Sequence, residues 1–215
     1  MKNLVFAIQP IFIPWIGFYD MIDKSEKFVI LDDVQFNRRG YVHRNKLNIN
    51  GNIKWLTLPI KKKSREVLIN ELDFDLKSEQ ILKFYKQIDI ITNSKSMEVF
   101  KIDLLNFKIN PLDYIINLNN KIVNILGISK KTILSSSLPT AHLKGEEKII
   151  QICKYLKANE YINLSGGKEL YNQDNFKKNN IKLNFIKAFP GTKVSILDYY
   201  KNNRDQLNIL KNIDE

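Results

Sequence analysis

Two short apolar runs flanking a helical pattern constrain the fold of this chain most strongly. The runs are LVFAI (4–8) and KFVIL (27–31), and each has the length and continuous apolar character of a buried strand. Between them, WIGFYDMIDKS (15–25) has apolar residues at helical spacing and follows Pro14, a residue favoured at helix starts. A strand, a helix and a strand joined by short connections form a βαβ unit, so the sequence predicts a parallel sheet.

The rest of the chain predicts a hairpin, a group of helices and further strands. Asn50–Gly51 is a strong hairpin turn signal between YVHRNKLNI and IKWLTLPI, and VLINELDFD (67–75) is expected to extend that local sheet. Helical patterns follow at about 76–90, 94–107, 111–126, 144–159 and after 195. KTILSSS (131–137) predicts a strand and a polar loop, EYINLSGG (160–167) a strand that enters a Gly turn, and IKLNFIKAF (181–189) a further strand. We expect a single α/β domain over 1–215, with a Rossmann-like parallel sheet, a small β-hairpin lobe and a helical insert at about 76–127.

The charge balance favours anionic partners and leaves their nature open. The 215 residues carry 34 Lys+Arg and 23 Asp+Glu, a formal net charge of +11. This excess favours nucleic acid, phosphates, nucleotide-sugars or a lipid surface. The alternative is codon bias, because the chain is rich in Lys, Ile and Asn together and only KKKSR (61–65) is a true cluster.

Cysteine usage and hydropathy narrow the class of protein. Cys153 is the only cysteine, so no internal disulfide or thiolate metal cluster is expected, and its place on the apolar side of a helix predicts a core residue. No zinc or EF-hand spacing occurs, so we expect no metal. No apolar run approaches the ~20 residues of a membrane span, and we expect a cytoplasmic protein.

The stretch LDDVQFNRRGYVHRNK (31–46) concentrates the scarce cationic residue of this chain. Three of the five arginines, Arg38, Arg39 and Arg44, lie within seven residues. The planar guanidinium binds carboxylate or phosphate through two parallel hydrogen bonds, which lysine cannot do. Three arginines together favour an anion site. The alternative is that Arg38 or Arg39 forms a structural ion pair with Asp32 or Asp33.

Polar residues follow three of the predicted strands. Gln9 follows the first, Asp32 and Asp33 the second, and Ser165–Gly166–Gly167 a later one. Because ligands bind at the carboxyl ends of strands in open α/β sheets, we expect these residues to face one pocket. His43 is a candidate general base, since cations nearby lower the pKa of an imidazole, and the alternative is a scaffold role.

Several motifs resemble the WbqC-like protein family along nearly the whole chain. They are QPIFIPWIGFYDMI, FVILDDVQFNRRGYVHRNKL and KWLTLPI, followed in order by ILSSSL, ICKYLKANEYINLSGG and SILDYYKNN. The resemblance implies a role in bacterial O-antigen and surface-polysaccharide biosynthesis, with possible contact to enzymes that assemble the polysaccharide. Tyr41 stands where that family usually has tryptophan, and the Gly turn is shorter than usual.

The family pattern falls on the candidate binding residues and on several structural positions. It covers Gln9, Pro10, Pro14, Trp15, Gly17, Asp32, Asp33, Gln35, Phe36, Arg39, Arg44, Asn45, Trp55, Pro59, Ser165, Gly166 and Gly167. The opening P-x-x-x-P-x-x-G-x-x-x-x-I also resembles nucleotidyltransferase-like Rossmann folds. Those enzymes place histidines within this motif, where this chain has Trp15, so the likeness implies the fold rather than adenylyl transfer.

These observations lead to two main hypotheses. The first is an enzyme that transfers an acyl or aminoacyl group to the amine of a nucleotide-linked sugar. The arginines would hold the diphosphate, Trp15 or Trp55 would stack on a ring, and Asp32, Asp33 or His43 would take the proton. The donor is undefined, with aminoacyl-tRNA as one option, and no further cofactor is expected. The second is a non-catalytic nucleotide-sugar or glycan carrier or scaffold. General nucleic-acid binding is a third hypothesis.

Overall fold

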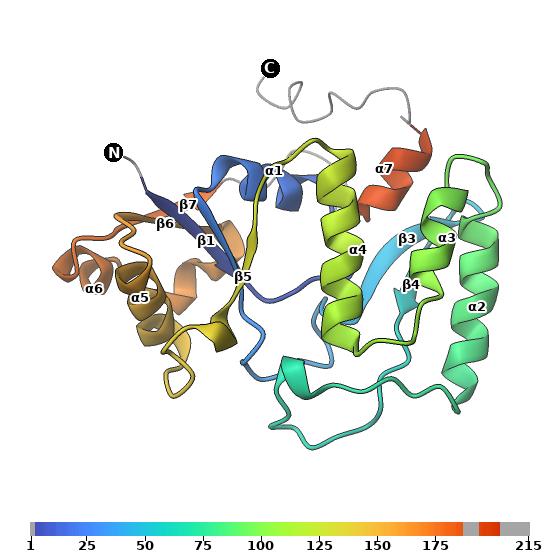
Figure 1. The fold of residues 1–215 in the computed structure, drawn as a ribbon, viewed down its shortest axis with the longest axis horizontal. Coiled ribbons are helices and arrows are strands. Elements are labelled where there is room, and N and C mark those ends of the chain that lie inside the picture. Colours follow the sequence, from blue (N-terminus) through green and yellow to red (C-terminus); the bar gives the residue numbers. More distant parts are fainter. Residues whose placement is uncertain (1–2, 187–193, 203–215) are drawn as a thin grey trace. The chain divides into compact units, whose positions relative to one another are not determined.

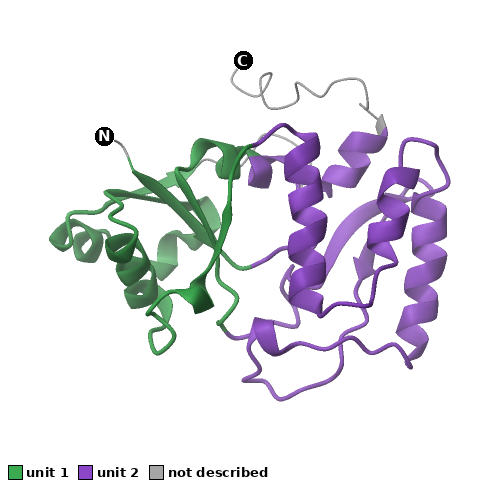
Figure 2. Ribbon diagram, viewed as in Figure 1, with its two compact units in different colours: residues 1–9, 20–34, 129–191 green, residues 10–19, 35–128, 192–215 purple. Residues whose placement is uncertain are grey.

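The computed structural model of this chain describes residues 3–186 and 194–202. The chain divides into two compact units, each assembled from separate segments (Figure 2). Unit 1 contains residues 1–9, 20–34 and 129–191, and unit 2 contains 10–19, 35–128 and 192–215. Helix α1 (Ile16–Lys24) contributes residues to both units, which are described one at a time below.

Unit 1 is built on a five-stranded sheet in the order β5-β2-β1-β6-β7, and every neighbouring pair is parallel. The prediction of a Rossmann-like parallel sheet is therefore confirmed. Each strand is short and largely apolar, as in sheets covered on both faces. The strands are β1 (Leu4–Ile8), β2 (Lys27–Ile30), β5 (Thr132–Leu134), β6 (Glu160–Leu164) and β7 (Lys182–Ile186).

Alternating residues of these strands build the core of unit 1. Val5 and Ala7 of β1 belong to a buried cluster with Tyr161 of β6 and with the apolar side chains of α5 (Gly145–Tyr155) and α6 (Gln173–Lys178). Both helices lie beside the sheet (Figure 1). From the other face, Phe6 stacks on Phe28 with ring centroids 5.5 Å apart. Cys153 is in the α5 cluster and fully buried, as the sequence predicts.

Unit 2 contains the predicted hairpin and the helices. β3 (Arg44–Ile49) and β4 (Asn52–Thr57) pair antiparallel around Asn50–Gly51, with φ of 53° and 77° at the two turn residues. The residues between 76 and 127 form α2 (Glu79–Ile91), α3 (Glu98–Leu104) and α4 (Pro111–Ile125), and α7 (Ile196–Asn202) follows later. Aromatic rings in mutual contact fill the interior, among them Phe12, Phe74, Phe84, Phe107 and Tyr114.

The segment before α1 is held in a strained conformation by buried asparagines. Ile13 has φ of 40°, a value that β-branched residues rarely adopt. Asn45, which is 1% exposed, donates from Nδ2 to the carbonyls of Phe12 (3.1 Å) and Ile13 (2.8 Å). Asn119 donates to the Ile11 carbonyl at 2.8 Å. These bonds satisfy carbonyls that no regular element pairs, and they offset the backbone strain.

Residues 67–75 are not the strand that the sequence predicts. They form a short 3-10 helix, η1 (Ile69–Glu71), between two isolated bridges, Gln35 with Leu68 and Ile60 with Phe74. The Glu71 carboxylate accepts from the Leu68 backbone N–H at 2.9 Å, so a local side-chain bond replaces the strand ladder. The helix predicted after 195 is present as α7, and its continuation past 202 lies outside the described residues.

Candidate functional site

The order of the strands places a topological switch point between β1 and β6. From β1 the chain goes to β2 and then β5 on one side, and it returns to place β6 and β7 on the other. In open α/β sheets the crevice at such a point, beyond the carboxyl ends of the strands, is the usual ligand site. Gln9 follows β1 and Ser165 follows β6, and each residue lies three positions beyond the last paired residues of these strands, Phe6 and Ile162.

The Gly turn after β6 lies in a 3-10 helix, η3 (Ser165–Leu170). A Cβ on Gly167 would lie 2.8 Å from Asn163 Nδ2, so the absence of a side chain there permits close packing. A Cβ on Gly166 would meet nothing within 4 Å, and this residue is exposed. Gly167 is therefore a packing residue, while Ser165 and Gly166 border the switch point.

The two acids after β2 are buried in a hydrogen-bonded network with the end of β5. Asp32 is 1% exposed, and its Oδ1 accepts from Ser135 Oγ at 3.1 Å and from the Ser136 N–H at 3.0 Å. Ser135 Oγ also donates to Asp33 Oδ1. Asp33 Oδ2 pairs with Lys148 Nζ at 2.8 Å. These partners of the two acids come from η2 (Ser135–Ser137) and α5.

Lys148 is the member of this network that the sequence reasoning missed. It lies on the buried face of α5 and is 1% exposed, and its Nζ also donates to the Thr140 carbonyl at 2.8 Å. Thr140 Oγ1 is buried and has no hydrogen-bond partner among the described residues. The sequence does contain a signal for this residue, because Lys148 lies four residues before Ile152 on the apolar side of an amphipathic helix. A buried lysine requires a partner, so this position predicts a buried ion pair or hydrogen bond.

Two of the three clustered arginines bind backbone carbonyls within unit 2. Arg38 Nη2 donates to the Lys63 carbonyl at 2.8 Å. Arg44 donates from Nη2 to the Arg39 carbonyl (2.7 Å) and from Nε to the Gly40 carbonyl (3.2 Å), and its Cζ lies 4.3 Å from the centre of the Trp55 ring. Within the described residues the Arg39 side chain makes no hydrogen bond or ion pair, and it is exposed. Of the three clustered arginines, Arg39 is therefore the most available to an anion.

His43 precedes β3 and is packed edge-on against Phe36, with ring centroids 5.0 Å apart. Burial, together with the positive charges of Arg44 and Arg38, lowers the pKa of His43 to about 4, and burial is the largest cause. The imidazole is therefore neutral at pH 7. Its Nδ1 is buried without a hydrogen-bond partner in the part of the chain that the structure describes. A neutral ring with an unused nitrogen is compatible with proton transfer, and its low pKa makes it a weak base.

The remaining predicted binding residues have mixed surroundings. Gln35 is exposed, and its Nε2 donates to the Arg65 carbonyl at 2.7 Å. Asn45 is buried and holds the strained segment described above. Trp15 and Trp55 are both half-buried, Trp15 against Phe18 and Trp55 beneath Arg44. Unit 1 therefore contains Gln9, Asp32, Asp33, Ser165, Gly166 and Gly167, and unit 2 contains the other predicted site residues.

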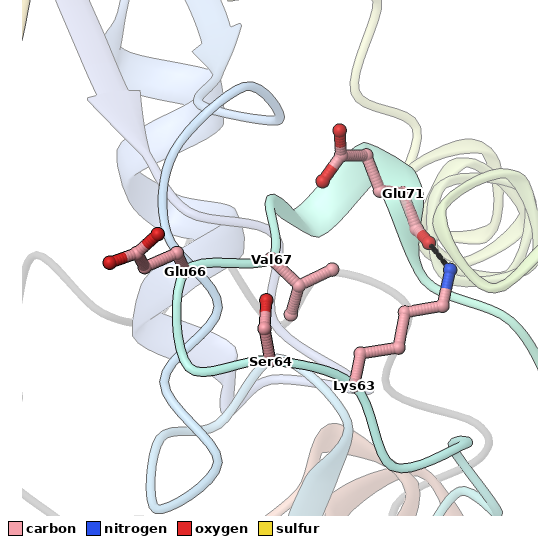
Figure 3. Close-up of a pocket in the computed structure, with 5 residues that line it drawn as sticks. All are labelled: Lys63, Ser64, Glu66, Val67 and Glu71. Atoms are coloured by element: carbon pink, nitrogen blue, oxygen red, sulfur yellow. Dashed lines mark hydrogen bonds between the residues drawn. The ribbon is translucent and has the colours of Figure 1, made fainter.

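A surface hollow of about 550 Å³ lies in unit 2, beside the segment that carries Arg38, whose Nη2 donates to the carbonyl of the lining residue Lys63. It is lined by Lys63, Ser64, Glu66, Val67 and Glu71 (Figure 3). Lys63 pairs with Asp73 at 2.8 Å and donates to the Glu71 carbonyl, so its charge is already used. The Glu66 carboxylate points away from the other four residues (Figure 3). These contacts do not make the hollow an anion site.

Among residues 3–186 and 194–202, no group of three His, Cys, Asp or Glu side chains is arranged to hold a metal ion. Burial raises the pKa of the Cys153 thiol to about 12, so it is not a thiolate nucleophile at neutral pH. No described helix combines the length and apolar character needed to cross a membrane.

Comparison with known proteins identifies the family. The chain is 27% identical over 168 residues to the uncharacterized protein Rv1507c of Mycobacterium tuberculosis (strain ATCC 25618 / H37Rv), covering 75% of this chain and 72% of that protein. No solved structure matches the chain significantly. The family model described as the WbqC-like protein family matches residues 9–205, which include the switch-point and arginine motifs. This chain belongs to the WbqC-like protein family.

Proposed function

We propose that this protein is an enzyme of bacterial surface-polysaccharide (O-antigen) biosynthesis that acylates or aminoacylates the amine of a nucleotide-linked sugar. The observation that carries the proposal is the switch point of the parallel sheet, bordered by Gln9 and Ser165, with Asp33 in the segment that follows the adjoining strand β2. Folds of this type bind nucleotides at this place. Membership of the WbqC-like family supports the pathway.

The reaction requires a base and a leaving group. The unprotonated sugar amine attacks the carbonyl carbon of an activated acyl or aminoacyl ester, forming a C–N bond. The C–O bond of the ester then breaks, and the proton lost by nitrogen passes through the base to the departing oxygen. Asp33, with Asp32 beside it, and His43 are the proposed proton acceptors. Arg39, Arg38 and Arg44 are proposed to bind the diphosphate, with Gln35 and Asn45 in support, and Trp15 or Trp55 to stack on a ring.

A non-catalytic carrier or scaffold of the same pathway is the second candidate. The network around Asp33 favours it, because both carboxylate oxygens accept bonds and the side chain is 7% exposed. Such a protein would bind a nucleotide-sugar with the same residues and turn nothing over. It could also contact the enzymes that assemble the polysaccharide.

Calorimetry and mass spectrometry with a UDP-linked amino sugar distinguish the candidates. In the enzyme case, Asp33→Asn or His43→Gln abolishes the acylated product while the affinity for the sugar persists. Arg39→Lys is expected to weaken binding roughly 10- to 100-fold, because one charge-assisted bond of about 1.5–3 kcal/mol is lost. Lys61→Ala is the control and should bind like the wild type. Binding without product under all donors supports the carrier, and absence of binding rejects both.

A further inference from the structure

Two loops of unit 2 are tied into one surface by hydrogen bonds between them. The first loop is 35–46 and the second is 61–67. Gln35 Nε2 donates to the Arg65 carbonyl at 2.7 Å, Arg38 Nη2 donates to the Lys63 carbonyl at 2.8 Å, and the Phe36 N–H donates to the Val67 carbonyl at 2.9 Å. The charged residues of both loops therefore act as one group, which we name the two-loop surface.

The two-loop surface carries most of the net charge of the chain. Its residues include eight Lys and Arg and one acid, Glu66, so eight positive charges less one negative leave +7 of the total +11. Asp73 compensates one of these cations through its pair with Lys63. Lys62, Arg65 and Arg39 are exposed and make no side-chain hydrogen bond or ion pair within the described residues. A dense field of unpaired cations attracts a polyanion.

Aromatic rings lie among these cations. Tyr41 is 42% exposed, and its ring centroid is 5.6 Å from that of Trp55. Arg44 lies over the Trp55 ring, and Lys46 Nζ is 5.4 Å from the centre of the same ring. Exposed rings between fixed cations are the arrangement with which proteins stack unpaired bases while binding the phosphates on either side.

We propose that the two-loop surface binds single-stranded nucleic acid, with phosphates on Lys62, Arg65 and their neighbours and an unpaired base on Tyr41. An anionic lipid surface needs only diffuse charge. Here two carbonyls hold the Arg44 guanidinium over the Trp55 ring, and this fixed, planar cation favours a planar partner. If the proposed function holds, the natural ligand is the RNA end that carries an aminoacyl donor; this last step rests on that proposal, whereas the binding itself does not.

Fluorescence polarisation with a labelled RNA of about 12 nucleotides, a length within known single-strand site sizes, tests the surface on the full chain. Titrations between about 50 and 200 mM salt should give a log–log slope near −0.7 for each phosphate neutralised. Lys62→Gln with Arg65→Gln should reduce that slope by about 1.4 and weaken binding roughly tenfold at low salt. The matched control, Lys177→Gln with Lys178→Gln, removes two exposed cations of α6 and should bind within about twofold of the wild type.

Tyr41 separates stacking from charge. Tyr41→Ala should weaken RNA binding roughly tenfold with an unchanged salt slope, and Tyr41→Phe should restore it, because stacking needs the ring and not the hydroxyl. Binding to DNA of the same sequence shows whether the protein distinguishes ribose from deoxyribose. Binding to vesicles of phosphatidylglycerol shows whether the surface binds any polyanion. If DNA binds as tightly as RNA, the two-loop surface binds single-stranded nucleic acid without selecting for ribose.

Three results overturn the inference. They are no RNA binding at the lowest salt, equal losses in the Lys62/Arg65 and Lys177/Lys178 variants, or tight binding to vesicles without binding to RNA. The nucleotide-sugar calorimetry is independent of these outcomes, because Lys62 and Arg65 are not in the proposed diphosphate site. If the protein binds the nucleotide-sugar but not RNA, the RNA-binding proposal is rejected and the proposed function is unaffected. If it binds RNA but not the nucleotide-sugar, only the proposed function is rejected.

Discussion

Lys148 Nζ lies 2.8 Å from Asp33 Oδ2, and the two side chains are 2% and 7% exposed. A buried pair of this kind is costly to break, because the remaining charge has no solvent to stabilise it. The pair joins α5 to the carboxyl end of β2, so it positions the acid that we propose as a proton acceptor.

We expect Lys148→Met and Asp33→Asn each to reduce the free energy of unfolding by about 3–5 kcal/mol. The double variant should lose much less than the sum, because no uncompensated charge remains. Urea denaturation measures all three. As a control, Lys101→Met, which removes an exposed partner of Asp89 at 3.3 Å, should cost about 0–1 kcal/mol. Additive losses in the double variant would show that the two residues act independently.

Arg44→Lys is expected to destabilise the hairpin of unit 2 despite its equal charge. A lysine cannot reproduce the two bonds to the Arg39 and Gly40 carbonyls together with the stacking on Trp55, and the loss should be about 1–2 kcal/mol. Thermal and urea denaturation provide the measurement. Arg39→Lys, whose side chain is exposed, should leave stability unchanged, and equal stability of both variants would contradict the structural role of Arg44.

The stability of the protein should fall below pH 6.5 because of His43. The pKa of this residue is about 4 in the folded protein, below the unfolded value of 6.5. Between these values the unfolded chain binds more protons than the folded one, so the free energy of unfolding rises with pH across this window. The contribution is present in full above pH 6.5 and is lost as the pH falls toward 4. The contribution of His43 to the free energy of unfolding is at most about 3 kcal/mol, and solvent screening of the half-buried ring makes it smaller.

Urea denaturation of the wild type and of His43→Gln between pH 4 and 7.5 isolates this contribution. The carboxylates affect both proteins alike, so the difference between the two slopes belongs to His43. We expect the variant to have a flatter dependence between pH 4 and 6.5. Parallel curves would show that the pKa of His43 is not depressed.

The two glycines of η3 should respond in opposite ways to alanine. In Gly167→Ala the new Cβ would meet Asn163 Nδ2 at 2.8 Å, so the amide must move and the variant should lose about 1–2 kcal/mol. Gly166→Ala meets nothing within 4 Å and should be neutral or more stable by up to about 1 kcal/mol, because the unfolded chain loses entropy. Thermal denaturation of this matched pair is the test. Equal melting temperatures would show that η3 accommodates a Cβ at Gly167 without a loss of stability.

Local pattern in the sequence was sufficient for the parallel sheet and the hairpin. The continuous apolar runs of β1 and β2 and the Asn50–Gly51 turn determine their own conformations, because strand burial and turn geometry depend on neighbouring residues. The same reasoning failed at 67–75, where Glu71 caps the Leu68 N–H and a bridge to Gln35 replaces a strand.

The partners of the site residues were decided only by the tertiary structure. From sequence, an arginine of the RRG segment was the alternative partner for Asp32 or Asp33, yet Lys148, 115 residues from Asp33, is the cation that Asp33 contacts. Likewise, nothing local indicates that Arg38 binds the carbonyl of Lys63, 25 residues away. The hydropathy pattern of the sequence predicts whether a side chain is buried. The identity of the partner of each charged side chain depends on the order of the strands and on the packing of the helices, because these bring together residues that are far apart in the chain.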